Sequence, residues 1–398
     1  MKKNSVWANN REYENLIQNL EMILCVILFL LFPVLAMPYL LYKIGTEKNN
    51  KRRYVYLTLF CVAMGFLAYH TVPLNSDDLS RHYANMKVLQ FTDFKDIFHS
   101  SYSLVYLNTL IMAIFAKMGT YQLYPMLYIV VGYGLIFYVY AKLTDKKKLY
   151  FSEKIGILLF VLFAVNCRDF ISGLRNYFSF IVCMYLIVAN KVFHQKKIVT
   201  YLGILCVSFI HTSAIAFLVW ELISDLPENK ILKRVITISI FLTLPVLFIV
   251  SQGFIPFVPQ TIVEKLDMYI STAHIINLKV YLYQMGIVFL MVCCHLINRR
   301  NHIKKFEKIN NFLDYYLVFM LAIIPIMTFL SRFVSFLVAI SPVILVQTYY
   351  TLRKNRKMRY IFTGILGCFI LAGILMLLAS MRAYPWNFSV KNIFIWWL

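Results

Sequence analysis

The stretch KIGILLFVLFAVNCRDFISGLRNYFSFIVCMYLIVAN, residues 154–190, decides the fold class. It contains two apolar runs, 154–171 and 172–190, and its charged residues after Lys154 are Arg168, Asp169 and Arg175. A helix needs about 20 mostly apolar residues to cross a hydrocarbon core of about 30 Å. Because each run has about that length, the stretch predicts two membrane-spanning helices joined by a short charged turn.

The composition of the whole chain agrees with this stretch. Of its 398 residues, 61% are hydrophobic and 15% are charged, whereas a soluble domain is about 45–50% apolar. The net charge of +22 would suit a nucleic-acid binder, but the basic residues cluster between apolar runs, so we expect no nucleic-acid partner. The chain is predicted to be an all-α polytopic membrane protein with a single transmembrane domain over residues 1–398.

Further apolar runs of similar length predict further spans. They lie at 20–42, 54–73, 120–141, 233–251, 278–297, 312–330, 333–350 and 359–380. Residues 104–118 are short and end in Lys117, whereas residues 198–223 form either one long helix or two short ones. Together these runs predict about 11 to 12 transmembrane helices.

The distribution of basic residues orients the spans, because Lys and Arg are retained on the cytoplasmic side. Six loops are basic, at 43–53, 142–154, 191–197, 230–234, 298–308 and 353–359. Placing all six in the cytoplasm leaves the N-terminus and the tail from Met381 outside. It also makes 74–118 an outer segment that ends in an interfacial helix, and 252–277 an outer loop that is a candidate lid.

Residues 198–223 lie between two basic loops that are both placed in the cytoplasm, so they must cross the membrane an even number of times. We therefore expect them to form two arms. The arms must rise and descend as a hairpin that turns near His211, each with about 13 residues and a length of about 20 Å. Arms of half the usual length are tolerated where protein shields them or where they line a cavity.

No motif in the chain points to a cofactor. The eight cysteines lie in or beside apolar runs without C-x-x-C spacing, and we interpret them as packing residues. Neither a nucleotide-binding glycine loop nor a cluster of His, Cys and carboxylate residues with metal-ligand spacing is present. We therefore expect neither a metal nor another cofactor.

The isolated ionisable residues are predicted to collect near the outer surface, where they would be functional candidates. They are Asp77, Asp78, Arg81 and His82 after the second span, Arg168, Asp169 and Arg175 at one outer turn, His211 on the hairpin, and Arg332 at another outer turn. Arginine binds phosphate through a planar fork that keeps its proton. A carboxylate or an imidazole can act as a general base. This combination suits glycosyl transfer from a lipid pyrophosphate.

Three of these segments carry a family resemblance. NSDDLSRHY (75–83), CRDF with GLRNY (167–177) and IHTSA (210–214) resemble motifs of the EpsG family of bacterial exopolysaccharide polymerases, relatives of the Wzy-type O-antigen and capsule polymerases. Weaker similarity is present in RFVSF (332–336) and in AYPW (383–386). Ser76 stands where the family commonly has Gly, and Leu79 follows Asp78, so either Asp77 or Asp78 matches the family aspartate.

The resemblance implies a fold, an activity and a site. The fold would be a GT-C-like or Wzy-like bundle with a cavity that faces the periplasm or the cell exterior. The activity would be metal-independent polymerisation of undecaprenyl-pyrophosphate-linked repeat units at the outer face of the bacterial cytoplasmic membrane. Partners would be the lipid-linked oligosaccharide, the bilayer, and a chain-length regulator and a flippase of the pathway. The implied catalytic residues are His211, Asp78 and Asp77, and the implied substrate-binding residues are Arg175, Arg168, Arg332, Arg81, Tyr83 and Tyr384.

Structural alternatives exist for several of these residues. Arg168 could simply pair with Asp169, and Arg332 could extend to the lipid headgroups. A lone histidine in an apolar stretch is commonly a packing residue, although we favour His211 as the general base because the hairpin would hold it within the bundle. The other seven histidines, His82 among them, show no grouping. A flippase of lipid-linked sugars, or an O-antigen ligase, would use the same arginines and is the alternative function.

Overall fold

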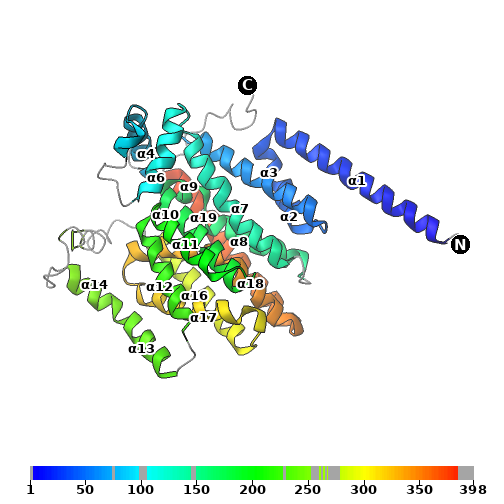
Figure 1. Ribbon diagram of the computed structural model, residues 1–398. Coiled ribbons are helices and arrows are strands. Elements are labelled where there is room, and N and C mark those ends of the chain that lie inside the picture. Colours follow the sequence, from blue (N-terminus) through cyan, green and yellow to red (C-terminus); the bar gives the residue numbers. More distant parts are fainter. Residues whose placement is uncertain are drawn as a thin grey trace.

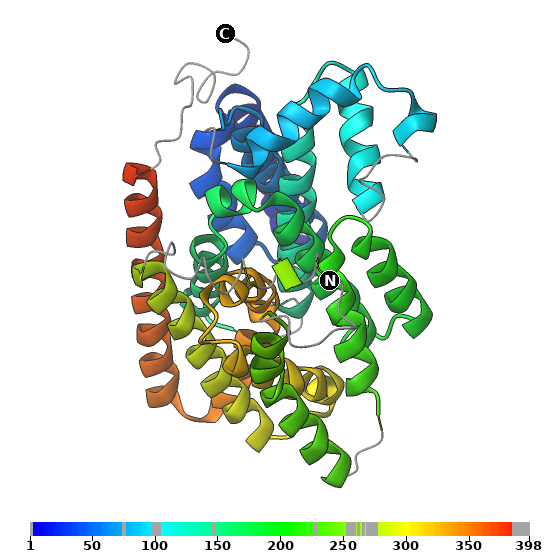
Figure 2. The same cartoon turned by 90° about the vertical axis from the view of Figure 1, so that its left-hand side faces the viewer.

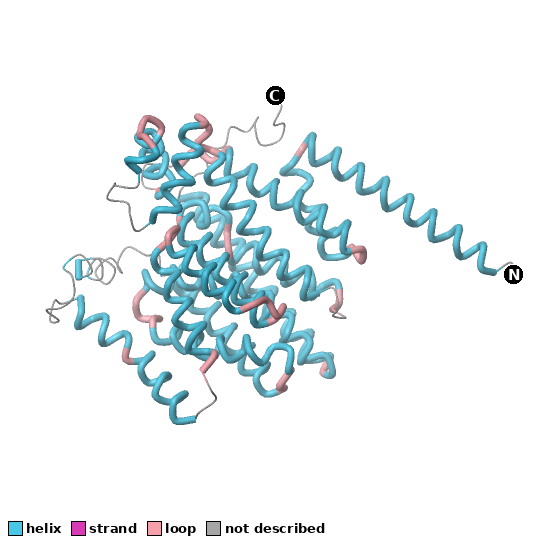
Figure 3. The backbone as a smooth tube through the Cα atoms, in the orientation of Figure 1, coloured by secondary structure: helices cyan, strands magenta, loops and turns pink. Residues whose placement is uncertain are grey.

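The computed structural model describes residues 3–73, 77–97, 105–144, 149–226, 230–251, 260, 263–264, 267 and 278–383, and it is built of helices joined by short loops (Figures 1 and 3). Among these residues there are 18 α-helices. Their bounds are α1 (Lys3–Leu31), α2 (Pro33–Thr46), α3 (Asn50–Tyr69), α4 (Asp78–Leu89), α5 (Phe94–Ile97), α6 (Tyr106–Lys117), α7 (Leu123–Thr144), α8 (Phe151–Ala164), α9 (Cys167–Ser172), α10 (Leu174–Lys191), α11 (Lys197–Ser208), α12 (Ile215–Ser224), α13 (Lys230–Phe241), α14 (Thr243–Ser251), α16 (Leu278–Arg300), α17 (Glu307–Ala322), α18 (Met327–Thr351) and α19 (Arg356–Ala383).

Four helices of the described chain, α7, α16, α18 and α19, are long and apolar enough to cross a membrane. Helix α18 stands in the middle and packs against α7, α8, α10 and α16. Its residues 333–349 are all buried, as expected for a helix that is apolar on every side. Helix α19 runs along one edge of the bundle (Figure 2) and exposes large apolar side chains such as Leu371 and Leu375. The all-helical architecture is confirmed, and the molecule has the character of a multi-pass membrane protein.

Stretch 154–190 forms two helices, but neither is among the four described helices that are long and apolar enough to cross a membrane, so the prediction of two membrane-spanning helices is not confirmed. Helices α8 and α10 are joined by the short helix α9, which starts after the N-cap residue Asn166. The Asn166 side chain accepts a hydrogen bond from the backbone N–H of Asp169 at 3.0 Å, which satisfies one free donor of the new helix. The charged turn of the sequence is therefore an ordered helix that fixes the start of α10.

The prediction of a single span at 20–42 is wrong. The chain leaves the helical conformation at Phe32, with φ −142° and ψ 71°, and α2 begins at Pro33. Proline disfavours the helical conformation in the residue before it. Glu21 of α1 accepts a hydrogen bond from Tyr39 and lies 2.5 Å from the ammonium of Lys43, so α1 and α2 run antiparallel as a hairpin.

This hairpin also changes the position of the N-terminus. Gln18 of α1 accepts a hydrogen bond from Arg52, at the start of α3. Helix α1 therefore begins at the end of the bundle that carries basic loop 43–53, not at the opposite end as the sequence suggested. In Figure 1, α1 projects from the bundle at this end.

The apolar run 233–251 is likewise divided, into α13 and α14, by a break at Leu242. Pro245 cannot donate the backbone hydrogen bond that would continue the helix back to Phe241, which explains the break. The two helices form an arm along the side of the bundle (Figure 1) and expose large apolar side chains such as Ile238 and Phe248. Most of the predicted outer loop 252–277, which follows this arm, lies outside the described residues.

Buried polar contacts hold the ends with basic loops together. Arg359 at the start of α19 forms a bidentate ion pair with Glu153 of α8, and both side chains are almost fully buried. Arg53 of α3 donates to the carbonyl of Ala141 at 3.3 Å and to Thr144 at 2.6 Å, both at the end of α7. These contacts place loops 43–53, 142–154 and 353–359 at one end of the molecule.

The predicted turn near His211 is confirmed. Helices α11 and α12 are separated by Phe209, Ile210, His211 and a 3-10 turn over Thr212–Ala214. Each arm is shorter than a membrane span. The turn lies at the end of the molecule opposite the basic loops, where α4 and α6 also lie.

Candidate functional site

Helix α4 presents a polar face at helical spacing. Asp78 is three and four residues before Arg81 and His82, and Asn85 is four and three residues after them, which places all four on one side of the helix. Asp78 lies in the first turn, where the helix dipole favours a negative charge, and it forms an ion pair with Arg81. The local sequence thus fixes which side chains of this segment can act together.

This face borders a cavity of about 240 Å³ between α4, α6 and α10. Its polar lining consists of Asp78, Arg81, His82, Asn85, Asn108, Thr109 and Arg175. Asp78 and Arg81, which are close together on α4, are therefore brought together with Arg175, which lies far from them in the sequence. The cavity combines a carboxylate, two guanidinium groups and neutral hydrogen-bonding side chains.

Asn108 of α6 is held rigidly in the cavity wall. Its side-chain oxygen accepts hydrogen bonds from Tyr124 at 2.8 Å and from Tyr128 at 3.0 Å, and the residue is 2% exposed. The backbone N–H groups of Leu107 and Asn108 donate to the carbonyl of Phe209 in the hairpin turn, at 3.1 and 3.4 Å. These bonds satisfy free donors at the start of α6 and attach the hairpin to the cavity.

Arg175 is the second residue of α10, where a positive charge is disfavoured by the helix dipole. Within the described part of the chain it has no carboxylate at ion-pair distance. Burial and the nearby charges of Arg175 and Arg81 lower the pKa of His82, in the short helix α4, to about 3. Arg175 thus brings a positive charge to the cavity without an ion pair to a described carboxylate.

His211 lies in the turn outside both helices of the hairpin. Its Nδ1 accepts hydrogen bonds from the backbone N–H of Ser213 at 3.3 Å and from the Ser213 hydroxyl at 2.6 Å. Because Nδ1 is the acceptor, the neutral imidazole carries its proton on Nε2. Burial and the charges of Arg175 and Arg332 lower its pKa, so the neutral form dominates near pH 7.

Arg168 faces Asp77, not its neighbour Asp169. Its guanidinium is 4.0 Å from the Asp77 carboxylate, which joins α9 to the start of α4. Asp169 instead accepts a hydrogen bond from the side chain of Asn166 at 3.0 Å, and burial raises its pKa to about 6 against the opposing effect of Arg168. Arg168 is thus at ion-pair distance from Asp77, while its charge also acts on the neighbouring Asp169.

Arg332 is not in a turn between two spans. The turn ends at Ile326, and Arg332 lies within α18, six residues from its start. The reason is that Met327–Ser331 continues the helical pattern upstream of the apolar run. Its carbonyl accepts a hydrogen bond from Asn176 of α10 at 3.4 Å, which places it next to the start of α10.

The remaining predicted residues lie elsewhere. The ring of Tyr83 packs against that of Tyr121, with centroids 6.2 Å apart, and its buried hydroxyl has no hydrogen-bond partner among the described residues. It does not line the cavity. Tyr384 lies outside the described residues. In the described part of the chain, no three His, Cys, Asp or Glu side chains are placed to hold a metal ion.

Sequence reasoning counted His82 among the ionisable candidates but gave it no role, and it missed the lining residues Asn85, Asn108 and Thr109. His82 and Asn85 could have been assigned to the site, because they continue the helical spacing from Asp78 and Arg81. Asn108 and Thr109 carried no signal of their own. They reach the cavity because α6 packs against α4 and α7.

The fold and the site define a class: an all-helical membrane protein with a charged cavity at the end opposite its basic loops. The chain belongs to the EpsG family, whose model matches residues 80–388. Membership identifies it as a membrane protein of exopolysaccharide biosynthesis. The match includes Arg81, Arg175 and His211 and begins just after Asp78. Comparison with curated proteins and with solved structures found no match.

Proposed function

We propose that this protein polymerises polyprenyl-pyrophosphate-linked oligosaccharide repeat units into an exopolysaccharide at the outer face of the cytoplasmic membrane. The observation that carries the proposal is the cavity between α4, α6 and α10, which combines Asp78 with the cations Arg81 and Arg175. Family membership supplies the biosynthetic context. The basic loops at the opposite end orient the cavity outward by the positive-inside rule.

The arginines are assigned to the pyrophosphate of the donor lipid. Arg175 offers a guanidinium fork without a carboxylate partner in the described chain, and a fork matches phosphate oxygens in a bidentate manner. The charge of Arg332 also acts on His211 and adds to that of Arg175. Together they would stabilise the negative charge that develops on the leaving group.

The reaction is a displacement at the anomeric carbon of the donor sugar. A hydroxyl oxygen of the acceptor sugar forms the new glycosidic bond, and the bond from the anomeric carbon to the pyrophosphate oxygen breaks. The electron pair leaves with the pyrophosphate, and the hydroxyl proton passes to a base. Asn85, Asn108 and Thr109 would orient sugar hydroxyls, because amides and hydroxyls both donate and accept hydrogen bonds.

We assign the base to Asp78 and a donor role to His211. Nδ1 of His211 already accepts two hydrogen bonds from Ser213, so Nε2 of the neutral ring presents N–H and cannot take a proton. That N–H suits an oxygen of the pyrophosphate. Asp78 lines the cavity with a carboxylate that also pairs with Arg81, whereas Asp77 is not part of the lining and lies 4.0 Å from Arg168. This assignment replaces the preference for His211 as the base.

Deleting the gene in its host and re-expressing variants tests the proposal. We expect the deletion strain to retain single lipid-linked repeat units and to lose the polymer, and wild-type protein to restore it. The variant Arg175→Ala should not restore polymer although it accumulates in the membrane, whereas the exposed control Lys304→Ala should. A deletion strain that exposes no repeat unit at the cell surface would indicate a flippase instead.

A further inference from the structure

A second hollow, of about 500 Å³, lies at the end of the bundle that carries the basic loops. It opens between α13, α16 and α17. Its lining consists of Lys233, Leu296, Arg299, Arg300, His302 and Asp314. None of these residues takes part in the outer cavity, so the hollow is a separate feature of the molecule.

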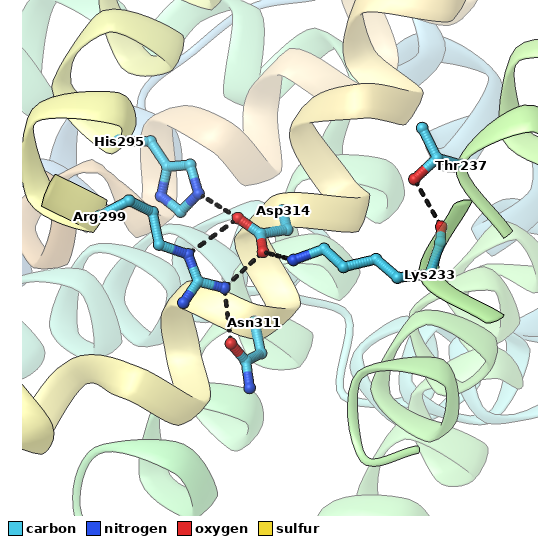
Figure 4. Close-up of polar contacts among 6 residues, drawn as sticks. All are labelled: Lys233, Thr237, His295, Arg299, Asn311 and Asp314. Carbon is cyan, nitrogen blue, oxygen red and sulfur yellow. Dashed lines mark hydrogen bonds and ion pairs between the residues drawn. The ribbon is translucent and has the colours of Figure 1, made fainter. Parts of the chain in front are cut away.

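Asp314 of α17 organises the cations of this hollow (Figure 4). Its carboxylate accepts hydrogen bonds from Lys233 of α13 at 2.6 Å and from Nε of Arg299 of α16 at 3.0 Å. Nε2 of the buried His295 lies 2.7 Å from the same carboxylate, and Asn311 accepts a further bond from Arg299 at 2.6 Å. Basic side chains from two helices are thus held in fixed positions around one acidic group.

The hollow has an excess of positive charge. Lys233, Arg299 and Arg300 face the single carboxylate of Asp314, and neither Arg300 nor His302 has an acidic partner among the residues that the structure describes. The C-terminus of α16 opposes an anion with about half a negative charge. This is smaller than the surplus of the three cations over one carboxylate, so the hollow attracts anions.

An apolar stripe leads to the hollow along α16. Leu282, Phe289 and Leu296 are about half exposed, and their spacing of seven residues places them on one face. The stripe ends at Arg299 and Arg300. Ile231 and Val235 of α13, two residues before and after Lys233, are also exposed. A free phosphate would need the cations alone, whereas a phospholipid would use both surfaces.

We propose that this hollow binds the phosphodiester headgroup of an anionic membrane lipid, with an acyl chain along the stripe on α16. Basic pockets between helices at the cytoplasmic surface are suited to such headgroups. Arg300 and His302 contact the phosphate directly, and Asp314 positions Lys233 and Arg299. Because Lys233 belongs to α13, the lipid links the α13–α14 arm to the bundle. Binding here does not depend on the chemistry of the outer cavity.

Native mass spectrometry of the purified full-length protein, with phosphatidylglycerol and phosphatidylcholine as probes, tests the proposal. We expect wild-type protein to bind phosphatidylglycerol at least tenfold more tightly. The variant Lys233→Gln/Arg300→Gln should lose about 25-fold in affinity for phosphatidylglycerol, since each basic residue near the surface contributes about a factor of five. The control Lys304→Gln/Lys308→Gln removes the same charge from the same loop region and should lose less than threefold.

The variant Asp314→Asn provides an independent test that does not depend on the folding of the first variant. It removes the negative charge, while the amide oxygen can still accept hydrogen bonds from Lys233 and Arg299, so it should bind phosphatidylglycerol at least as tightly as wild type, and weaker binding would overturn the proposal. Equal losses in the two double variants would overturn the proposal, because they would indicate diffuse surface charge. Displacement of the lipid by inorganic phosphate at equal concentration would also overturn it, because the acyl chain would then contribute nothing.

Discussion

The assignment of base and donor predicts opposite outcomes for two conservative variants. Asp78→Asn keeps the shape of the side chain but removes its proton acceptor, and loss of a general base costs about 10²- to 10⁴-fold in rate. His211→Gln keeps an N–H donor near the position of Nε2 but removes the imidazole. We therefore expect Asp78→Asn to abolish most polymerisation and His211→Gln to lose less than about tenfold.

The hydrogen bonds of His211 set the size of its contribution. A donor to a charged oxygen contributes about 1.5–3 kcal/mol, which corresponds to about 10- to 150-fold in rate. His211→Ala, which removes the donor entirely, should fall within that range. The imidazole presents a donor at Nε2 because the bonds from Ser213 at 3.3 and 2.6 Å keep Nδ1 from carrying the proton. Ser213→Ala should consequently have a smaller effect than His211→Ala.

Initial rates of polymer formation, measured with purified protein and lipid-linked repeat units at matched protein levels, distinguish these outcomes. The ladder of product lengths on a gel gives a second readout of processivity. If His211→Gln lost as much activity as Asp78→Asn, the donor assignment would be refuted and the imidazole would be the base. Full activity of Asp78→Asn would transfer the role of the base to Asp77.

Three further predictions concern single interactions. Arg175→Lys keeps the charge but loses the fork, so activity should fall about 10- to 150-fold at normal membrane levels, as measured by initial rates. Glu153→Ala leaves the buried guanidinium of Arg359 unpaired and should lower the free energy of unfolding by about 3–5 kcal/mol. The double variant Glu153→Met/Arg359→Met should recover most of this loss of stability, as measured by thermal unfolding. The pKa of His82 is about 3 in the folded chain and ordinarily 6.5, so the unfolded chain binds more protons and stability should fall as pH drops from 7 to 5. Unfolding midpoints should show a shallower fall in His82→Gln.

The positions of helices were largely predictable, because a membrane span needs a long apolar run and such runs are visible in one dimension. The break at Phe32 was missed because the run 20–42 has the length of one span, and Pro38 within α2 is tolerated while Pro33 ends α1. The position of Arg332 was missed for a related reason. Hydropathy marks apolar runs, whereas the break between α17 and α18 lies at 323–326, inside the apolar run 312–330.

Some features of the candidate site could likewise be predicted from the local sequence, and others depend on how the helices pack. The face of α4 was present in the spacing of Asp78 and Arg81, since helical periodicity is a local property. The partner of Arg168 could not be predicted from the sequence, because the choice between Asp77 and Asp169 depends on how α9 packs against α4. The protonated nitrogen of His211 depends on the cap that it makes with Ser213, which follows from the shape of the turn.

By itself, the sequence determined the all-helical membrane character, the turn near His211 and the group of basic loops, because each follows from residues close together along the chain. The tertiary structure alone decided that Arg175 meets Asp78 across a cavity, that Asn108 forms its wall, and that Lys233 joins the Asp314 cluster. These contacts join helices that are far apart in the chain. Their side chains come together only when packing against the buried helix α18 fixes the position of each neighbour.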